Sequence, residues 1–179
     1  LNAITCKFEN KIILENISLN IEKHLSVLGA NGAGKSTLAK VICDLVAFKG
    51  ELSVDGRNVA DFSLKERAKL ISYIPAKLDI YDSFINMEEF VLLGRFAHKN
   101  TLFDYSSSDR KIAKECLEFL RIDHLASHAI SSLSSGETQL ALIAQALAQQ
   151  SKIIIFDEPT ANLDPKNSKI IAEHIKGLK

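Results

Sequence analysis

The sequence of 179 residues has few cysteines and no long apolar run. Cys6, Cys43 and Cys116 lie far apart and form no C-x-x-C pair, which argues against a disulfide framework or a zinc site. No apolar run approaches the roughly 20 residues that span a bilayer. The first residues also lack the basic and then apolar layout of a signal peptide. We therefore expect buried, reduced thiols in a cytosolic protein.

An excess of charge of one sign is absent as well. Lysine and arginine together number 22, aspartate and glutamate together number 22, and the formal net charge is zero. A domain that binds nucleic acid through its charge is usually basic, so this balance argues against a nucleic-acid partner. Hydrophobic residues make up 46% of the chain, which is enough for the buried core of one ordinary domain or slightly more.

Glycine is scarce, yet it is concentrated at one place. Three of the 8 glycines fall within six residues of the stretch Gly29–Ser36, which matches the pattern G-x-x-x-x-G-K-[ST]. The glycines allow backbone N–H groups to surround an anion, and a helix that begins near Lys35 would direct its positive dipole end at the same anion. Lys35 would reach the β- and γ-phosphates of a nucleotide, and the Ser36 hydroxyl would bind Mg²⁺.

The residues around this loop follow strand and helix patterns. We expect strands over Ala3–Phe8, Lys11–Leu14, Ile17–Ile21, His24–Leu28 and Ile71–Ile74. A helix should follow the loop, with a buried face formed by Leu38, Val41, Ile42 and Leu45. The alternation of Leu52 and Val54 before Asp55-Gly56 predicts a hairpin.

The pattern becomes helical between Ala76 and Ser132. Helical spacing covers Met87–Arg95 and Asp109–Arg121, and the serines at 106–108 predict an N-cap for the second helix. A third helix should bury Leu140, Ile143, Ala144 and Leu147. The apolar run Ile153–Phe156 predicts a parallel strand buried on both faces.

Two carboxylates, Asp157 and Glu158, come directly after that strand. Ligands of open α/β sheets bind at the carboxyl ends of the strands, so Asp157 would hold Mg²⁺ and Glu158 would orient or deprotonate an attacking water. Taken alone this signal is weak, because strands often end in acidic residues.

The stretch Leu133–Glu137 is most simply a helix N-cap, although the same geometry offers a second anion site.

In this order, the three motifs resemble those of the ATP-binding subunit of ABC transporters, over essentially the whole chain. Gly29–Ser36 matches the Walker A loop and Leu133–Glu137 resembles the LSGGQ signature. Ile153–Glu158 with Pro159-Thr160 matches Walker B and its DEPT continuation, and residues 161–164 look like the D-loop.

The resemblance implies an α/β fold: a P-loop NTPase (RecA-like) core with an N-terminal antiparallel β subdomain and an α-helical insert subdomain. A single ABC ATPase domain would comprise the β subdomain and Walker A core in 1–75 and the helical subdomain in 76–132. Residues 133–179 would carry the signature, Walker B and the D-loop.

The resemblance also implies the site residues. ATP would be held by Phe8, Gly29, Asn31, Gly32, Ala33, Gly34, Lys35, Ser36, Thr37, Ser134 and Gly136. Phe8 takes the place of an aromatic residue that stacks on adenine, although a lone phenylalanine on a strand could equally belong to the core. Ser36 and Asp157 would bind Mg²⁺, and Glu158 would be the catalytic residue.

The implied mechanism joins two such ATPase subunits head to tail around two ATP molecules. The signature of one, at Ser134 and Gly136, would contact the γ-phosphate held by Lys35 of the other. The helical insert would dock on transmembrane permease subunits, which places the protein in the cytoplasm, peripheral on the inner face of the cell membrane. Val91–Arg95 and the later Asp109 resemble subunits of iron-chelate, haem or cobalamin importers.

The sequence departs from the family pattern at several places, among them the segment Thr138–Leu140 after the signature, which lacks the family's usual arginine. Ala76 stands where a glutamine usually follows the strand that ends Tyr-x-Pro, and Ser135 replaces the first glycine of the signature. The strand with the switch histidine would lie beyond Lys179, which implies a cassette truncated at its C-terminus, and His174 is not that histidine. These departures leave open a catalytically degraded nucleotide-binding cassette, and a non-transport ABC ATPase of the DNA-repair or translation type is a further alternative.

Overall fold

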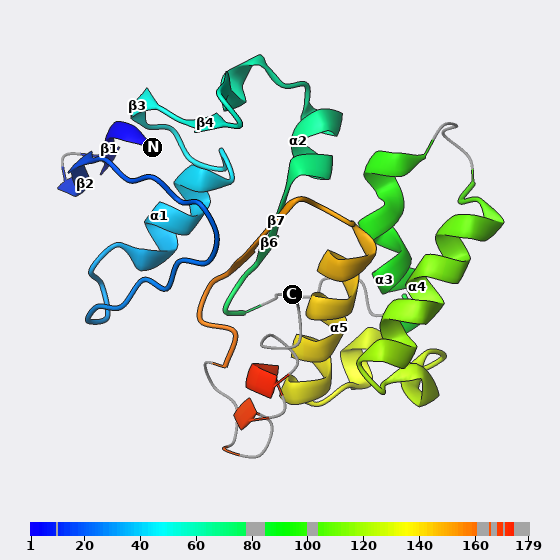
Figure 1. The fold of residues 1–179 in the computed structure, drawn as a ribbon. Helices are drawn as coiled ribbons and strands as arrows, with labels where there is room; N and C mark the ends of the chain where they lie inside the picture. The colour runs from blue at the N-terminus through cyan, green and yellow to red at the C-terminus, as the bar shows by residue number, and fades with distance from the viewer. Residues whose placement is uncertain are drawn as a thin grey trace. The chain divides into compact units, whose positions relative to one another are not determined.

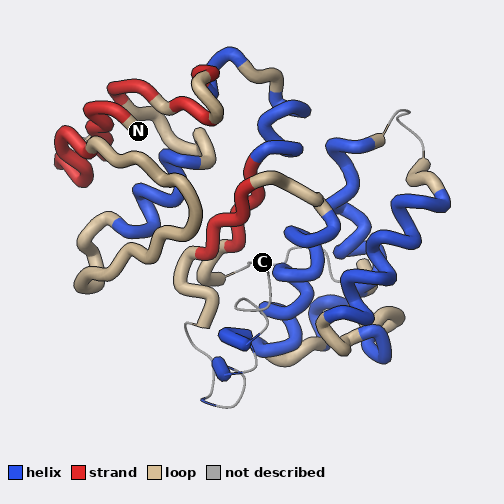
Figure 2. Tube along the Cα trace, in the orientation of Figure 1, coloured by secondary structure: helices blue, strands red, loops and turns tan. Residues whose placement is uncertain are grey.

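The computed structural model describes residues 1–9, 11–77, 85–99, 104–160, 165, 168–169 and 171–173. The chain divides into two compact units, Leu1–Arg67 and Ala68–Lys179. Figure 1 labels the helices and strands of both units, and Figure 2 separates helix, strand and loop. Each unit is described by itself.

The first unit contains a small antiparallel sheet in the order β2-β1-β3. Its strands are β1 (Asn2–Phe8), β2 (Lys11–Ile17) and β3 (Lys49–Glu51). Helix α1 (Lys35–Ile42) follows the glycine-rich stretch, and its buried side chains Leu38 and Val41 join the core with those of the sheet. The predicted antiparallel strands and the helix after the loop are confirmed.

A short hairpin continues this unit. Strands β4 (Ser53–Val54) and β5 (Arg57–Asn58) pair across Asp55 and Gly56, whose φ angles are 52° and 78°. Two successive positive φ values are those of a type I′ turn, which joins twisted strands with two residues. The hairpin predicted from Asp55-Gly56 is therefore confirmed.

Three predictions within the first unit are wrong. The strand predicted over Ile17–Ile21 is absent, because β2 ends at Ile17 and the next residue, Ser18, accepts from the Ala3 N–H through its hydroxyl at 2.9 Å. One further backbone pair joins Leu19 to Leu1. Residues 24–28 form no strand: none of the backbone hydrogen bonds among the described residues involves them, and a strand needs a paired neighbour. Leu45 lies past the end of α1 and is exposed.

In the second unit, two strands far apart in sequence form a parallel pair. Helix α2 (Leu64–Leu70), which begins in the first unit, leads into β6 (Ile71–Ile74), and β6 runs parallel to β7 (Ile153–Phe156). Pro75 directly follows β6, as expected of a residue that cannot donate to the ladder. The residues of β7 are only half-buried, so the expectation of a strand buried on both faces is wrong.

Helices make up most of the remainder of this unit. α3 (Met87–Leu92) continues into a 3₁₀ helix (Leu93–His98), and α4 (Ser107–Phe119) and α5 (Ser135–Ala148) pack with α3 around a shared core. Figure 1 shows these three helices side by side. Short 3₁₀ helices span Asp123–Leu125 and Ile130–Ser132 in this unit, and Val59–Asp61 in the first unit. The three predicted helices are confirmed, and α5 buries more of its circumference than the single predicted face.

The three cysteines are free, and none lies fully on the surface. Burial raises the pKa of the Cys43 thiol to about 12 and that of the Cys116 thiol to about 11, so both stay protonated at neutral pH. The prediction of reduced thiols without a disulfide agrees with this environment. In the part of the chain that the structure describes, no helix has the length and apolar character needed to cross a membrane.

Candidate functional site

The glycine-rich stretch lies in the first unit and ends on the N-terminus of α1. Gly34 is the N-cap, with φ at 94°, and no side chain caps the helix. A Cβ on Gly34 would come within 3.1 Å of Leu14 Cδ2 and would also be strained by the positive φ. Gly32 has a φ of 80°, so both glycines take up backbone conformations that other residues rarely adopt.

Lys35 bends back over this loop. Its Nζ donates to the carbonyl oxygens of Gly29 and Ala30, each at 3.1 Å. Asn31, Gly32 and Ala33 at the loop tip are exposed, and Ser36 and Thr37 follow in the first turn of the helix. A cationic side chain beside a helix N-terminus without a side-chain cap suits a phosphate group, which agrees with the sequence prediction for these residues.

Phe8, the last residue of β1, lies in the same unit. Its side chain is 48% exposed, so the alternative that it belongs to the core is excluded. An exposed aromatic ring at the end of a strand is available for stacking on a base.

The acidic pair lies in the second unit, directly after β7. Asp157 is only 7% exposed, and its backbone N–H donates to the Ile74 carbonyl at 2.9 Å. The Tyr73 hydroxyl donates to Asp157 Oδ2 at 2.8 Å. Glu158 is exposed and has a positive φ of 49°. Sequence reasoning missed Tyr73, although its place two residues before Pro75 at the end of β6 was a usable signal.

The signature-like stretch forms the N-terminus of α5. Ser134 is the N-cap: its hydroxyl donates to Glu137 Oε2 at 2.6 Å and accepts from the Glu137 N–H at 3.3 Å, while its own N–H donates to the same carboxylate at 2.8 Å. The simple N-cap interpretation is therefore confirmed. The hydrogen bonds from the Ser134 hydroxyl and N–H, with help from His124 and His128, lower the pKa of Glu137. Gly136 is buried in the first turn.

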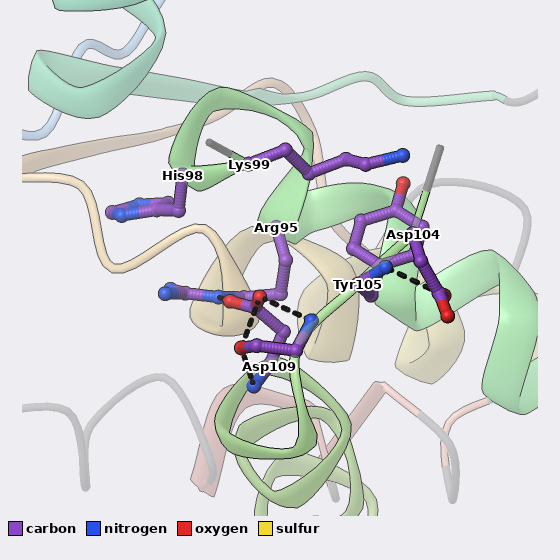
Figure 3. A pocket seen from close by; sticks show the side chains of 7 residues that line it. Arg95, His98, Lys99, Asp104, Tyr105 and Asp109 are labelled. Atoms are coloured by element: carbon purple, nitrogen blue, oxygen red, sulfur yellow. Dashed lines mark hydrogen bonds and ion pairs between the residues drawn. The ribbon is translucent and has the colours of Figure 1, made fainter. Parts of the chain in front are cut away.

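A polar cavity of about 430 Å³ lies elsewhere, in the helical insert (Figure 3). Its floor is the ion pair between Arg95 Nε and Asp109 Oδ1 at 2.9 Å, with both side chains nearly buried. Lys99 stacks on the Tyr105 ring, 4.4 Å from its centroid. Arg95 and Asp109 bind each other, and we assign this cavity to the architecture of the insert.

The predicted site residues are divided between the two units. Gly29–Thr37 and Phe8 belong to the first unit, whereas Ser134, Gly136, Asp157 and Glu158 belong to the second. The predicted D-loop at 161–164 and His174 lie outside the described residues. Among the described histidine, cysteine, aspartate and glutamate residues, no group of three could hold a metal ion by itself.

The fold and the glycine-rich loop before α1 define an α/β domain of the P-loop class. Residues 14–161 match the family described as ABC transporter. An uncharacterised ABC transporter ATP-binding protein of Haemophilus influenzae is 37% identical over 174 residues, covering 96% of this chain and 66% of that protein. A protein of Helicobacter pylori described as an iron chelatin transport ATP-binding protein is 34% identical, covering 97% of this chain and 69% of its own length.

Solved structures of ABC cassettes agree with the fold. A structure described as a metal-chelate type ABC transporter in an inward-facing conformation has a TM-score of 0.81 and 31% identity, over 99% of this chain and 66% of that one. A dimeric ATP-binding cassette with bound ADP and phosphate has a TM-score of 0.80 and 30% identity, over 99% of this chain and 81% of that one. The chain belongs to the ABC transporter family, as its ATP-binding domain, and spans about two-thirds of the length of these curated relatives.

Proposed function

We propose that the protein binds and hydrolyses ATP as the energising subunit of an ABC importer. The observation that carries this proposal is the Gly29–Ser36 loop on the N-terminus of α1, where the N-cap is a glycine and Lys35 lies over the loop. Backbone N–H groups and the helix dipole at this end favour a polyphosphate, and Lys35 adds a positive charge. The exposed ring of Phe8 would stack on the adenine.

Magnesium fits the side chains available for it. Ser36 would contribute a hydroxyl and Asp157 a carboxylate, both hard oxygen ligands that suit a hydrated Mg²⁺. The ion would neutralise charge on the β- and γ-phosphates. Glu158, exposed next to Asp157, would orient the attacking water and accept its proton.

The signature contributes to the site of a second subunit in this proposal. Ser134 and the Gly136 backbone, at the N-terminus of α5, would contact the γ-phosphate held by the partner's loop. A similar cassette is a dimer with ADP and phosphate bound, which supports a pair of subunits.

The transported cargo is proposed from relatives and from the insert. Proteins similar to this chain are described as transporting iron chelatin or manganese. Leu93, Phe96 and Phe119 are exposed apolar side chains on the helical insert, which would dock on permease subunits at the inner face of the membrane. We propose an iron-siderophore, haem or cobalamin as the class of cargo, and residues 1–75, 76–132 and 133–179 as the functional divisions.

The loop assignment is tested by Lys35→Ala. We expect the variant to lose detectable binding of a fluorescent ATP analogue, because it removes the charge that lies over the phosphate loop. Lys40→Ala, on the exposed face of the last turn of the same helix, should bind as the wild type does. Unchanged affinity in Lys35→Ala would refute the assignment.

A degraded cassette that binds ATP without hydrolysing it is the second candidate, favoured by Ala76 and Ser135 in place of the family's glutamine and glycine. Release of inorganic phosphate from ATP distinguishes the two candidates. An active ATPase releases phosphate as the wild type and not as Glu158→Gln, whereas a degraded cassette releases none in either form. A non-transport ABC ATPase would instead be purified from cells without a membrane subunit.

A further inference from the structure

Tyr73 and Asp157 lie on one face of the parallel pair β6–β7. In the register of the pair, Tyr73 is opposite Ile155 and Ile74 is opposite Phe156. Side chains alternate along a strand, so Tyr73, Ile155 and Asp157 share a face. Ile74 and Phe156 point to the other face, where they belong to the core of this unit. Tyr73 therefore stands beside the acidic end of β7 and not in the core.

Asp157 is bound to β6 through both its backbone and its side chain. The Asp157 N–H donates to the Ile74 carbonyl at 2.9 Å, which extends the ladder one residue past the end of β7. The Tyr73 hydroxyl donates to Asp157 Oδ2 at 2.8 Å. A carboxylate that is only 7% exposed requires such partners. Its orientation is thus set by β6 before any ligand binds.

The side chains of the two residues after β6 cannot take the place of the tyrosine hydroxyl. Pro75 and Ala76 follow the strand, and the Ala76 methyl group can neither bind a metal ion nor donate a hydrogen bond. The Tyr73 hydroxyl on β6 reaches the Walker B carboxylate. A carboxylate has about four acceptor sites, so Asp157 can keep the tyrosine bond while it binds a hydrated ion.

We propose that Tyr73 is a positioning residue of the magnesium site, whose hydroxyl holds the Asp157 carboxylate in the orientation that binds hydrated Mg²⁺. This inference rests on the proposed function, because the ion arrives with the nucleotide. Tyr73 acts through Asp157, as the hydrogen-bond partners behind metal ligands do, and such partners typically change metal affinity about tenfold or more.

The test is Tyr73→Phe, which keeps the ring and removes the hydroxyl. The dissociation constant of a non-hydrolysable ATP analogue is measured for the full chain in EDTA and in Mg²⁺. We expect the affinity in EDTA to be unchanged and the gain on adding Mg²⁺ to be about tenfold smaller than in the wild type. Tyr105→Phe makes the same change in the helical insert and should leave both dissociation constants at their wild-type values.

A second variant separates positioning from a merely structural role. Asp157→Asn is measured in the same way, and the double variant with Tyr73→Phe should lose no more of the magnesium gain than Asp157→Asn alone. A wild-type magnesium gain in Tyr73→Phe, whatever its thermal stability, would overturn this inference and leave the proposed function standing. A wild type that binds no analogue in either condition would overturn the proposed function, and this inference with it.

Discussion

At the scale of single residues, two hydroxyl groups each donate a hydrogen bond to a carboxylate of a motif. Tyr73 donates to Asp157 and Ser134 donates to Glu137. A serine hydroxyl has one proton to donate. If Ser134 is to donate to a phosphate oxygen, it must therefore release Glu137, which then keeps the Ser134 N–H as its partner. Binding of phosphate at the signature thus requires one hydrogen bond of the cap to be exchanged.

The Ser134–Glu137 cap predicts a pH dependence of stability. The hydrogen bonds from Ser134 lower the pKa of Glu137 from its ordinary value of 4.5 in the folded state. A carboxylate whose pKa is lower in the folded state stabilises the fold at pH values above its pKa in the unfolded state. This stability is lost as the pH falls through the pKa of the folded state. In Glu137→Gln the amide can keep the capping contacts without titrating.

We expect the urea midpoint of the wild type to fall relative to that of Glu137→Gln as pH decreases from about 5 to about 3. Glu88→Gln removes a charge from an exposed position on α3 and should follow the wild type. Parallel curves for the wild type and Glu137→Gln would contradict the assigned role of the carboxylate.

At the scale of elements, Arg95 joins the helical insert to the end of α5. Its Nε binds Asp109 at the start of α4, and its Nη1 donates to the Ala148 carbonyl at 2.7 Å and to Gln150 Oε1 at 2.8 Å. Gly94 next to it packs so closely that a Cβ would lie within 2.2 Å of the Gln145 carbonyl oxygen. The insert and α5 therefore meet along a tight, hydrogen-bonded contact.

Arg95→Ala should be strongly destabilising. It leaves the Asp109 carboxylate buried without its cation, which costs about 3–5 kcal/mol in the free energy of unfolding for a buried pair. Arg110→Ala removes a pair with Asp104 that lies on the surface and should cost about 1 kcal/mol or less. Urea denaturation measures the free energy of unfolding of both variants. Equal losses of stability would contradict the larger effect expected for the buried pair.

Elements with local signals were predictable, and those that depend on distant partners were not. The glycine loop, the Asp55-Gly56 hairpin and the serine caps follow from neighbouring residues, so the sequence alone predicts them. Residues 24–28 have strand composition, but a strand forms only where another strand pairs with it. The Tyr73–Asp157 contact could not be predicted from the sequence, because it depends on the register of two strands and joins residues 84 positions apart.

At the scale of the whole molecule, we propose association with protein subunits. The chain has no net charge, whereas domains that bind nucleic acid through their charge are usually basic. The predicted association with a second ATPase subunit depends on ATP staying bound between the two.

Glu158→Gln should accumulate an ATP-bound dimer, because the amide cannot accept the proton of the attacking water while the nucleotide contacts remain. Light scattering after gel filtration in Mg-ATP measures the mass. Glu118→Gln, the same change on the exposed face of α4, should remain a monomer under these conditions. A Glu158→Gln variant that is monomeric in ATP would argue against the head-to-tail mechanism.

Both ends of α5 are held by side chains, and this has a mechanical consequence. The helix of 14 residues is about 21 Å long, with Glu137 capping one end and Arg95 bound to the other. The Arg95 contact and Ser134 of the signature therefore lie at the two ends of one helix, and we expect a displacement of that helix to move both.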